Sequence, residues 1–169
     1  MHSDEVYREK IPFLVGKLVV VLMIGLTALF LGLFFYQLLA QPVGERPAPN
    51  WYYLVMFLVF LIISILVVNF WELKVSATSQ TITIAYGKIK YTIAWQNVKS
   101  YYQDTNTGLA YGGWGIRVGF ARGKSVLVYN VIGYPRIVLE LYEGKFAQFA
   151  FSTRQPEAVM DIVQNQTGK

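Results

Sequence analysis

One stretch of this chain has residues of the kind that bind a nucleotide phosphate. Residues 119–125 read GFARGKS, which places a glycine ahead of a Gly-Lys-Ser triplet. A phosphate-binding loop needs four residues between the first glycine and the Gly-Lys pair, and a helix whose first turn faces the phosphate. Here three residues intervene, and the following Val126–Tyr129 has the composition of a strand. The pattern therefore predicts a hairpin turn.

Three lysines, Lys74, Lys88 and Lys90, form a second candidate site for a phosphate, here one carried by a lipid headgroup. Ammonium groups and loop amides can together surround a phosphate. However, residues 77–80, the expected loop between the first two strands after residue 71, carry no cation. The lysines near this loop are out of register for a shared pocket. We expect a solvated basic face that attracts anionic lipid loosely.

A third set of residues suits a protein interface. Aromatic and basic side chains are the usual anchors of protein–protein contacts. A partner or a second copy of the chain could bind there; alternatively, Trp114 plugs one end of the β domain. The candidate interaction residues are Tyr111, Trp114, Arg117, Arg122 and Lys124.

Catalytic chemistry has few side chains to use in this sequence. The chain has no cysteine and a single histidine, His2, near its start. Thiolate metal sites, cysteine nucleophiles and most metal or triad chemistry are thereby removed. The carboxylates after residue 71 are scattered. We expect no enzymatic activity, no cofactor, no metal, no small-molecule substrate and no nucleic-acid partner.

Two uncharged runs explain why 54% of the 169 residues are hydrophobic and the mean hydropathy is +0.39. They are the 23 residues from Leu18 to Ala40 and the 21 from Trp51 to Trp71. Each is long enough for a helix to span a bilayer. Buried core helices, or a cleaved signal peptide at the first run, are the alternatives. We expect a tail at 1–11 and a transmembrane hairpin at 12–71, with helices at 12–40 and 51–71.

Small residues and charges predict how this hairpin packs and is oriented. Gly25, Ala28 and Gly32 fall on one helical face, where they would let the second helix approach closely. The turn between the helices has one cation, Arg46, whereas several precede and follow the hairpin. The positive-inside rule then places both termini in the cytoplasm. We expect a multi-pass protein of the inner (cytoplasmic) membrane.

From residue 72 onward the hydrophobic pattern changes to period two, as in Thr81–Ile84 and Lys88–Trp95. Alternation with β-branched and aromatic residues predicts half-buried strands. Glycine turns suggest about seven short antiparallel strands. Pro156 and an apolar stripe at Val159, Ile162 and Val163 predict a last helix. The fold class is thus α+β, with residues 72–169 as a cytoplasmic domain of strands capped by a helix.

Two motifs make this domain resemble a known family. They are Gly112-Gly113-Trp114-Gly115-Ile116-Arg117 and the helix start Ser152-Thr153-Arg154-Gln155-Pro156-Glu157. Together with the hairpin, residues 72–165 resemble the prokaryotic pleckstrin-homology-like domains that follow one or two membrane helices. The resemblance implies a bent β-barrel of seven strands capped by the C-terminal helix, with a non-enzymatic interaction or scaffold role.

These observations favour a membrane-anchored interaction module, a subunit or assembly factor of a membrane complex or a homo-oligomer. A sensor of anionic lipid and an accessory subunit of a transporter or channel are the alternatives. The expected partners are membrane lipids and either another protein or a second copy of the chain.

Overall fold

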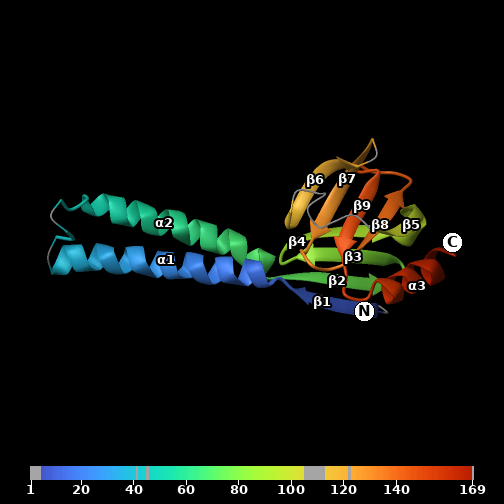
Figure 1. The fold of residues 1–169 in the computed structure, drawn as a ribbon, viewed down its shortest axis with the longest axis horizontal. Helices are drawn as coiled ribbons and strands as arrows, with labels where there is room; N and C mark the ends of the chain where they lie inside the picture. Colours follow the sequence, from blue (N-terminus) through green and yellow to red (C-terminus); the bar gives the residue numbers. More distant parts are fainter. Residues whose placement is uncertain (1–4, 41, 45, 105–112, 122, 169) are drawn as a thin grey trace. The chain divides into compact units, whose positions relative to one another are not determined.

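The computed structural model describes residues 5–40, 42–44, 46–104, 113–121 and 123–168 (Figure 1). The chain divides into two compact units. A helical unit holds Phe13–Trp71, and a β unit combines the residues up to Pro12 with those from Glu72 onward. The β unit is therefore built from both ends of the chain, and the helical unit is inserted between them.

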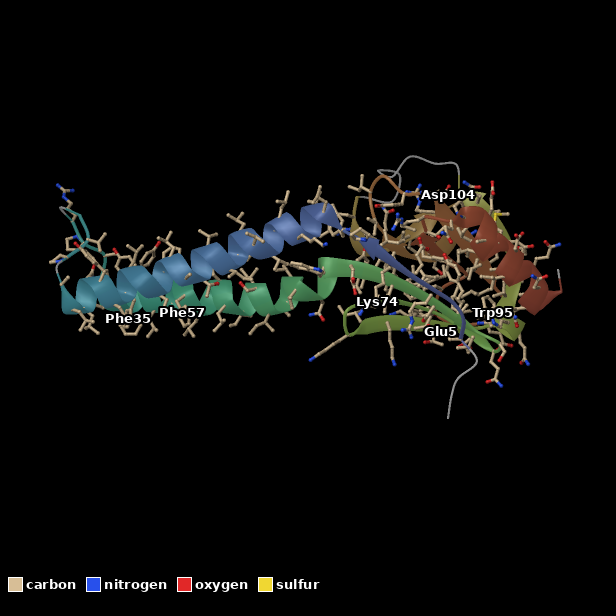
Figure 2. All side chains as sticks on the ribbon, turned by 90° about the horizontal axis from the view of Figure 1, so that it is seen from below. Glu5, Phe35, Phe57, Lys74, Trp95 and Asp104 are labelled. Atoms are coloured by element: carbon tan, nitrogen blue, oxygen red, sulfur yellow. The ribbon has the colours of Figure 1, made fainter. Side chains whose placement is uncertain are left out.

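The helical unit contains α1 (Leu14–Leu39), α2 (Asn50–Val67) and a closing 3-10 turn, η1 (Val68–Trp71). The expected pair of long apolar helices is confirmed. The bounds of α1 lie within two residues of those predicted, whereas α2 ends at Val67 and η1 carries the helical turn on to Trp71, the predicted end. By length and composition, both are able to cross a membrane. In their most apolar windows only 6% and 0% of residues are buried. Helices in the core of a soluble protein would be mostly buried. Figure 2 shows that the side-chain nitrogen and oxygen atoms are concentrated in the β unit.

The two long helices contact each other through large and hydroxyl side chains. The rings of Phe30 and Phe60 stack with centroids 5.3 Å apart. The hydroxyl oxygens of Thr27 and Ser64 lie 3.2 Å apart, within hydrogen-bond distance. At the turn, the Gln37 amide donates to the Ala48 carbonyl oxygen at 2.7 Å. The helices are thus held together by an aromatic stack, a pair of hydroxyl groups and a hydrogen bond from the Gln37 side chain to the backbone of the turn.

The predicted small-residue contact face is wrong. Gly25, Ala28 and Gly32 are exposed, and a methyl group added at either glycine meets nothing within 4 Å. The close approach lies elsewhere: a Cβ on Gly16 would come within 2.6 Å of the Phe70 carbonyl oxygen. The phenyl and hydroxyl pairs turn another side of α1 toward α2.

Sheet A of the β unit has the strand order β1-β2-β3-β4, with every pair antiparallel. The expected tail differs from this structure, because residues 5–12 form β1 and pair with β2 along its length. Pro12 ends this edge strand, a place where its missing N–H costs little. The strands are β1 (Glu5–Pro12), β2 (Glu72–Thr78), β3 (Thr81–Tyr86) and β4 (Ile89–Ala94).

Sheet B has the order β5-β8-β9-β7-β6, and β7 pairs with β9 in parallel. The expected bent barrel of about seven antiparallel strands is wrong in three respects. The described strands form two sheets that do not close into a barrel, eight of them follow residue 71, and one pairing is parallel. The strands are β5 (Val98–Asp104, after the short η2, Trp95–Asn97), β6 (Gly115–Ala121), β7 (Lys124–Asn130), β8 (Arg136–Leu141) and β9 (Gln148–Ser152).

Aromatic rings fill the space between the two sheets. Tyr86 of β3 stacks on Tyr129 of β7 at 6.0 Å, and Tyr91 of β4 stacks on Phe149 of β9 at 5.0 Å. The Tyr86 hydroxyl donates to the Asn130 carbonyl oxygen at 2.8 Å, and burial raises its pKa. These ring pairs join sheet A to sheet B without shared strand hydrogen bonds.

The last helix, α3 (Pro156–Thr167), begins at the proline that predicted it. Val159 and Val163 of the predicted stripe are buried. Gly168 ends the helix with φ of +67°, the left-handed conformation that glycine adopts without strain. The sequence prediction of a C-terminal helix is confirmed.

Candidate functional site

The outer face of sheet A carries cations in register across its strands. Lys10 of β1 lies opposite Lys74 of β2, Lys74 lies opposite Ala85 of β3, and Ala85 lies opposite Lys90 of β4. Arg8 lies opposite Ser76 in the neighbouring row. Because side chains alternate between faces of a strand, these residues all point to the side away from the core. The sheet thereby displays one row of three lysines and an adjacent arginine.

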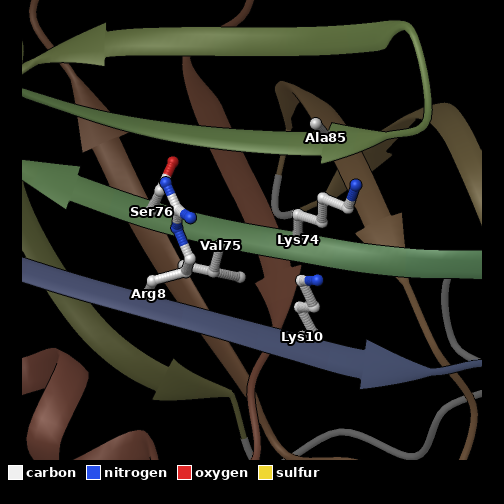
Figure 3. A pocket seen from close by; sticks show the side chains of 6 residues that line it. All are labelled: Arg8, Lys10, Lys74, Val75, Ser76 and Ala85. Carbon is white, nitrogen blue, oxygen red and sulfur yellow. The ribbon is translucent and has the colours of Figure 1, made fainter.

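A groove of about 290 Å³ lies among these cations. Figure 3 shows the side chains of Arg8, Lys10 and Lys74 around it, with the short side chains of Ser76 and Ala85 on the strands beside them. Small residues on the sheet leave room between the long basic side chains. We call this the basic groove; its lining residues are Arg8, Lys10, Lys74, Val75, Ser76 and Ala85.

The basic groove places like charges on neighbouring strands. Cβ atoms of cross-strand partners lie about 5 Å apart, and like charges in such pairs repel. Glu72 lies 3.1 Å from the Lys74 ammonium, and Glu5 lies 2.6 Å from Arg8. Both ion pairs are solvent-exposed, so each stabilises the fold little. An anion bound between Lys10 and Lys74 would relieve the repulsion that remains.

The inner side of β1 is held by a buried carboxylate. Glu9 is only 9% exposed and accepts hydrogen bonds from the Thr153 hydroxyl and the Arg154 backbone N–H, each at 2.7 Å. The Tyr7 hydroxyl also donates to it, at 3.0 Å. Burial and the nearby carboxylate raise the pKa of Tyr7 to about 12, so this hydroxyl keeps its proton. Glu9 thus fixes the strand that carries Arg8 and Lys10.

A second hollow, of about 280 Å³, flanks β1 beside the start of α3. Arg8 and Lys10 line it together with Arg154 and Gln155. The two β1 cations therefore border both hollows, and Arg154 adds a further positive charge nearby. Within the described part of the chain, no three His, Asp or Glu side chains gather as a metal site. The chemistry offered here is electrostatic binding of an anion.

The structure places only one of the three lysines predicted to bind a phosphate in the basic groove. Lys74 lines the basic groove, whereas Lys88 and Lys90 do not. Lys90 shares the cross-strand row with Lys74, and Lys88 lies in the turn before β4. The sequence interpretation missed Arg8 and Lys10, because both were assigned to a tail. Tyr7 and Ile11 alternate with these cations, but Glu9 between them interrupts the apolar pattern that marks the inner face of a strand.

The predicted interaction residues also separate. Arg117 is exposed on β6, and Trp114 is partly buried just before that strand. Lys124 instead donates to Glu140 at 2.8 Å. This bond, with those from Gln148 and Ser100, lowers the pKa of Glu140 to about 2. Tyr111 and Arg122 lie outside the described residues.

Comparison with known proteins adds no relative. No family model matches the chain, no curated protein matches its sequence, and no solved structure matches its fold.

Proposed function

We propose that this chain is a membrane-anchored, non-catalytic interaction module whose basic groove binds the anionic headgroups of lipids in its own membrane. The observation that carries the proposal is the juxtaposition of Lys10 and Lys74 on paired strands, with Arg8 beside them. The cytoplasmic leaflet of a membrane bears negative lipids, which attract basic surfaces next to it.

Chain connectivity supports the closeness of this groove to the lipid surface. Lys10 comes four positions before the first residue of α1, and Lys74 comes three positions after Trp71. At about 3.3 Å per strand residue, each cation is tethered within roughly 15 Å of a helix end. If α1 and α2 cross the membrane, these lysines are close to the headgroups on one side.

Strand pairing supports a common side for the two ends of the chain. β1 precedes the helices and β2 follows them, and the two strands share one sheet. A sheet cannot form across a bilayer, so both strands lie on the same side after two crossings. The single cation of the turn, Arg46, against Arg8, Lys10 and Lys17, favours the cytoplasm as that side. The inner membrane of a prokaryotic cell is the location we propose.

The attraction is large enough to measure. Each basic residue near an anionic leaflet contributes roughly 1 kcal/mol. The three cations of the basic groove would therefore contribute at most about 3 kcal/mol, which corresponds to roughly 150-fold in affinity, and less where Glu5 and Glu72 stay paired with Arg8 and Lys74. At physiological ionic strength the Debye length is about 8 Å, so unspecific attraction weakens steeply with salt.

The test uses the full chain in neutral detergent, titrated with short-chain phosphatidylglycerol or phosphatidylcholine. We expect phosphatidylglycerol alone to raise the melting temperature. The double change Lys10→Gln with Lys74→Gln should abolish this rise. The matched control, Lys99→Gln with Lys145→Gln, removes the same charge from exposed positions outside the groove and should preserve it.

Two outcomes would contradict the proposal. An equal loss in both double variants would mean that net charge alone attracts the lipid. A rise caused equally by inorganic phosphate would mean that the groove binds free anions and does not require lipid.

A scaffold role toward proteins is the second candidate function. A specific observation favours it: β6, the outermost described strand of sheet B, exposes apolar side chains.

A further inference from the structure

β6 is an unusual edge strand. Among the described strands it is the outermost one of sheet B and pairs with β7 alone (Figure 1). Its alternate residues Ile116, Val118 and Phe120 share one face, on which Val118 is 66% exposed and Phe120 82% exposed. Among the described large hydrophobic residues, Phe120 is the most exposed, ahead even of those on the helices. Edge strands usually carry charges that prevent pairing with other strands, whereas β6 has a single charged residue, Arg117.

The backbone of β6 can accept another strand on its outer side. Ala121 and Lys124 are cross-strand partners with two residues between them, so a two-residue loop closes on a hydrogen-bonded pair. Hydrogen-bonded and non-bonded pairs alternate along an antiparallel ladder. Gly119 and Arg117 therefore direct their backbone groups to β7. The backbone groups of Ile116, Val118 and Phe120 face the free edge.

We propose that β6 pairs antiparallel with β6 of a second copy of this chain, about a two-fold axis at Val118. In this register Val118 lies opposite its own copy, and Ile116 lies opposite Phe120. An apolar ladder of six side chains results. Arg117 lies opposite Gly119, so no like charges meet across the axis. The strand is thus complementary to itself in both hydrogen bonding and charge.

The other sheet edges fit a second copy less well. β1 has four charged side chains, and the exposed face of β4 presents Lys90 and Thr92. On the far edge of sheet B, β5 carries Lys99 and a buried Asp104.

One strand pair buries less area than a stable dimer in solution requires. Anchoring in a shared bilayer would raise the effective concentration of the two copies, as linkage does for tethered modules.

Cysteine cross-linking tests this register directly, because the chain has no native cysteine. The full chain is reconstituted in vesicles and oxidised with copper phenanthroline. We expect Val118→Cys to form a disulfide dimer by itself, because paired Cα atoms about 5.5 Å apart allow the bond. Phe120→Cys alone should not cross-link, since its copies lie roughly 13 Å apart along the strand. Phe120→Cys mixed with Ile116→Cys should cross-link.

Gln103→Cys is the matched control, since it is an exposed position on β5, the opposite edge of the same sheet. It should remain monomeric under the same oxidation. The change Val118→Lys would place two ammonium groups at the axis. We expect this variant to be monomeric in nanodiscs in which the wild-type chain is dimeric, with an unchanged melting temperature.

The proposal is overturned if Val118→Cys and Gln103→Cys cross-link to the same small extent. It is also overturned if the wild-type chain is monomeric in vesicles while a dye on Phe120→Cys is quenched by spin-labelled lipid. That second result would assign the β6 face to the membrane.

Discussion

Replacing Glu9 with alanine should destabilise the β unit strongly, because its carboxylate is the buried acceptor that joins β1 to the segment before α3. Three hydrogen bonds reach this carboxylate, two of them at 2.7 Å. Hydrogen bonds to charged groups each contribute about 1.5–3 kcal/mol. The cost of burying the charge offsets part of this sum. The change also leaves the Thr153 hydroxyl, which is fully buried, without its carboxylate acceptor.

We therefore expect Glu9→Ala to lower the free energy of unfolding by about 3 kcal/mol. For a domain of this size, that is a fall of roughly 10 °C or more in melting temperature. Circular dichroism of the full chain in detergent measures the melting. Hydrogen exchange should show faster exchange in β1 than in β7, because the lost contact belongs to the first strand.

Glu5→Ala is the matched control on the same strand. Glu5 pairs with Arg8, whose side chain is 67% exposed, so its removal should cost less than about 1 kcal/mol. If Glu9→Ala and Glu5→Ala melt at the same temperature, the argument that the buried carboxylate fastens β1 is refuted.

Three further predictions follow from the helices, the surface carboxylate and the turn. Gly16→Leu should lower the melting temperature, because a side chain there collides with the backbone of η1, whereas Gly32→Leu should leave it unchanged; equal effects would contradict the contact. The depressed pKa of Glu140 means that its ion pair stabilises the fold fully above about pH 4.5 and is lost as pH falls through about 2. The stability difference between wild type and Glu140→Gln, measured by urea unfolding, should therefore shrink over that window, and a constant difference would argue against it. In intact cells an impermeant thiol reagent should label Gly44→Cys and not Gly168→Cys, and the reverse pattern would invert the topology.

The two long helices were predictable because uncharged runs of 23 and 21 residues leave few structures other than helices. The sequence did not allow us to predict which faces of the two helices contact each other. Small residues permit close packing but do not require it. Here the Phe30–Phe60 stack and the Thr27–Ser64 pair determine which sides meet.

The sequence allowed the strands and the last helix of the β unit to be predicted, but not the order in which the strands pair. Period-two alternation identified β3 and β4, whereas β9 reads QFAFS and is buried on both faces. A strand without alternation gives no information on its neighbour, so its parallel pairing with β7 could not be foreseen. The division into two sheets depends on such pairings.

The missed half of the basic groove has a similar cause. β1 directs Glu9 inward, where an alternating strand should have an apolar residue. Its hydrogen-bond partner Thr153 lies 144 positions later, too distant for any local pattern to reveal. Lys74 was found because it follows a clear hydrophobic run, and Lys10 was missed because its strand resembles a charged tail.

The split origin of sheet A also constrains the order of synthesis. β1 leaves the ribosome before its partner β2, which begins 60 positions after β1 ends, and the residues that satisfy Glu9 are made later still. At about 5–20 residues per second, β1 waits several seconds for β2 and longer for Thr153. During that interval both long helices, which could cross a membrane by length and composition, have already been made. If the helices cross a bilayer, completion of the sheet requires that insertion has returned the nascent chain to its starting side. A chain inserted with one crossing would then keep its first strand unpaired and exposed to proteases.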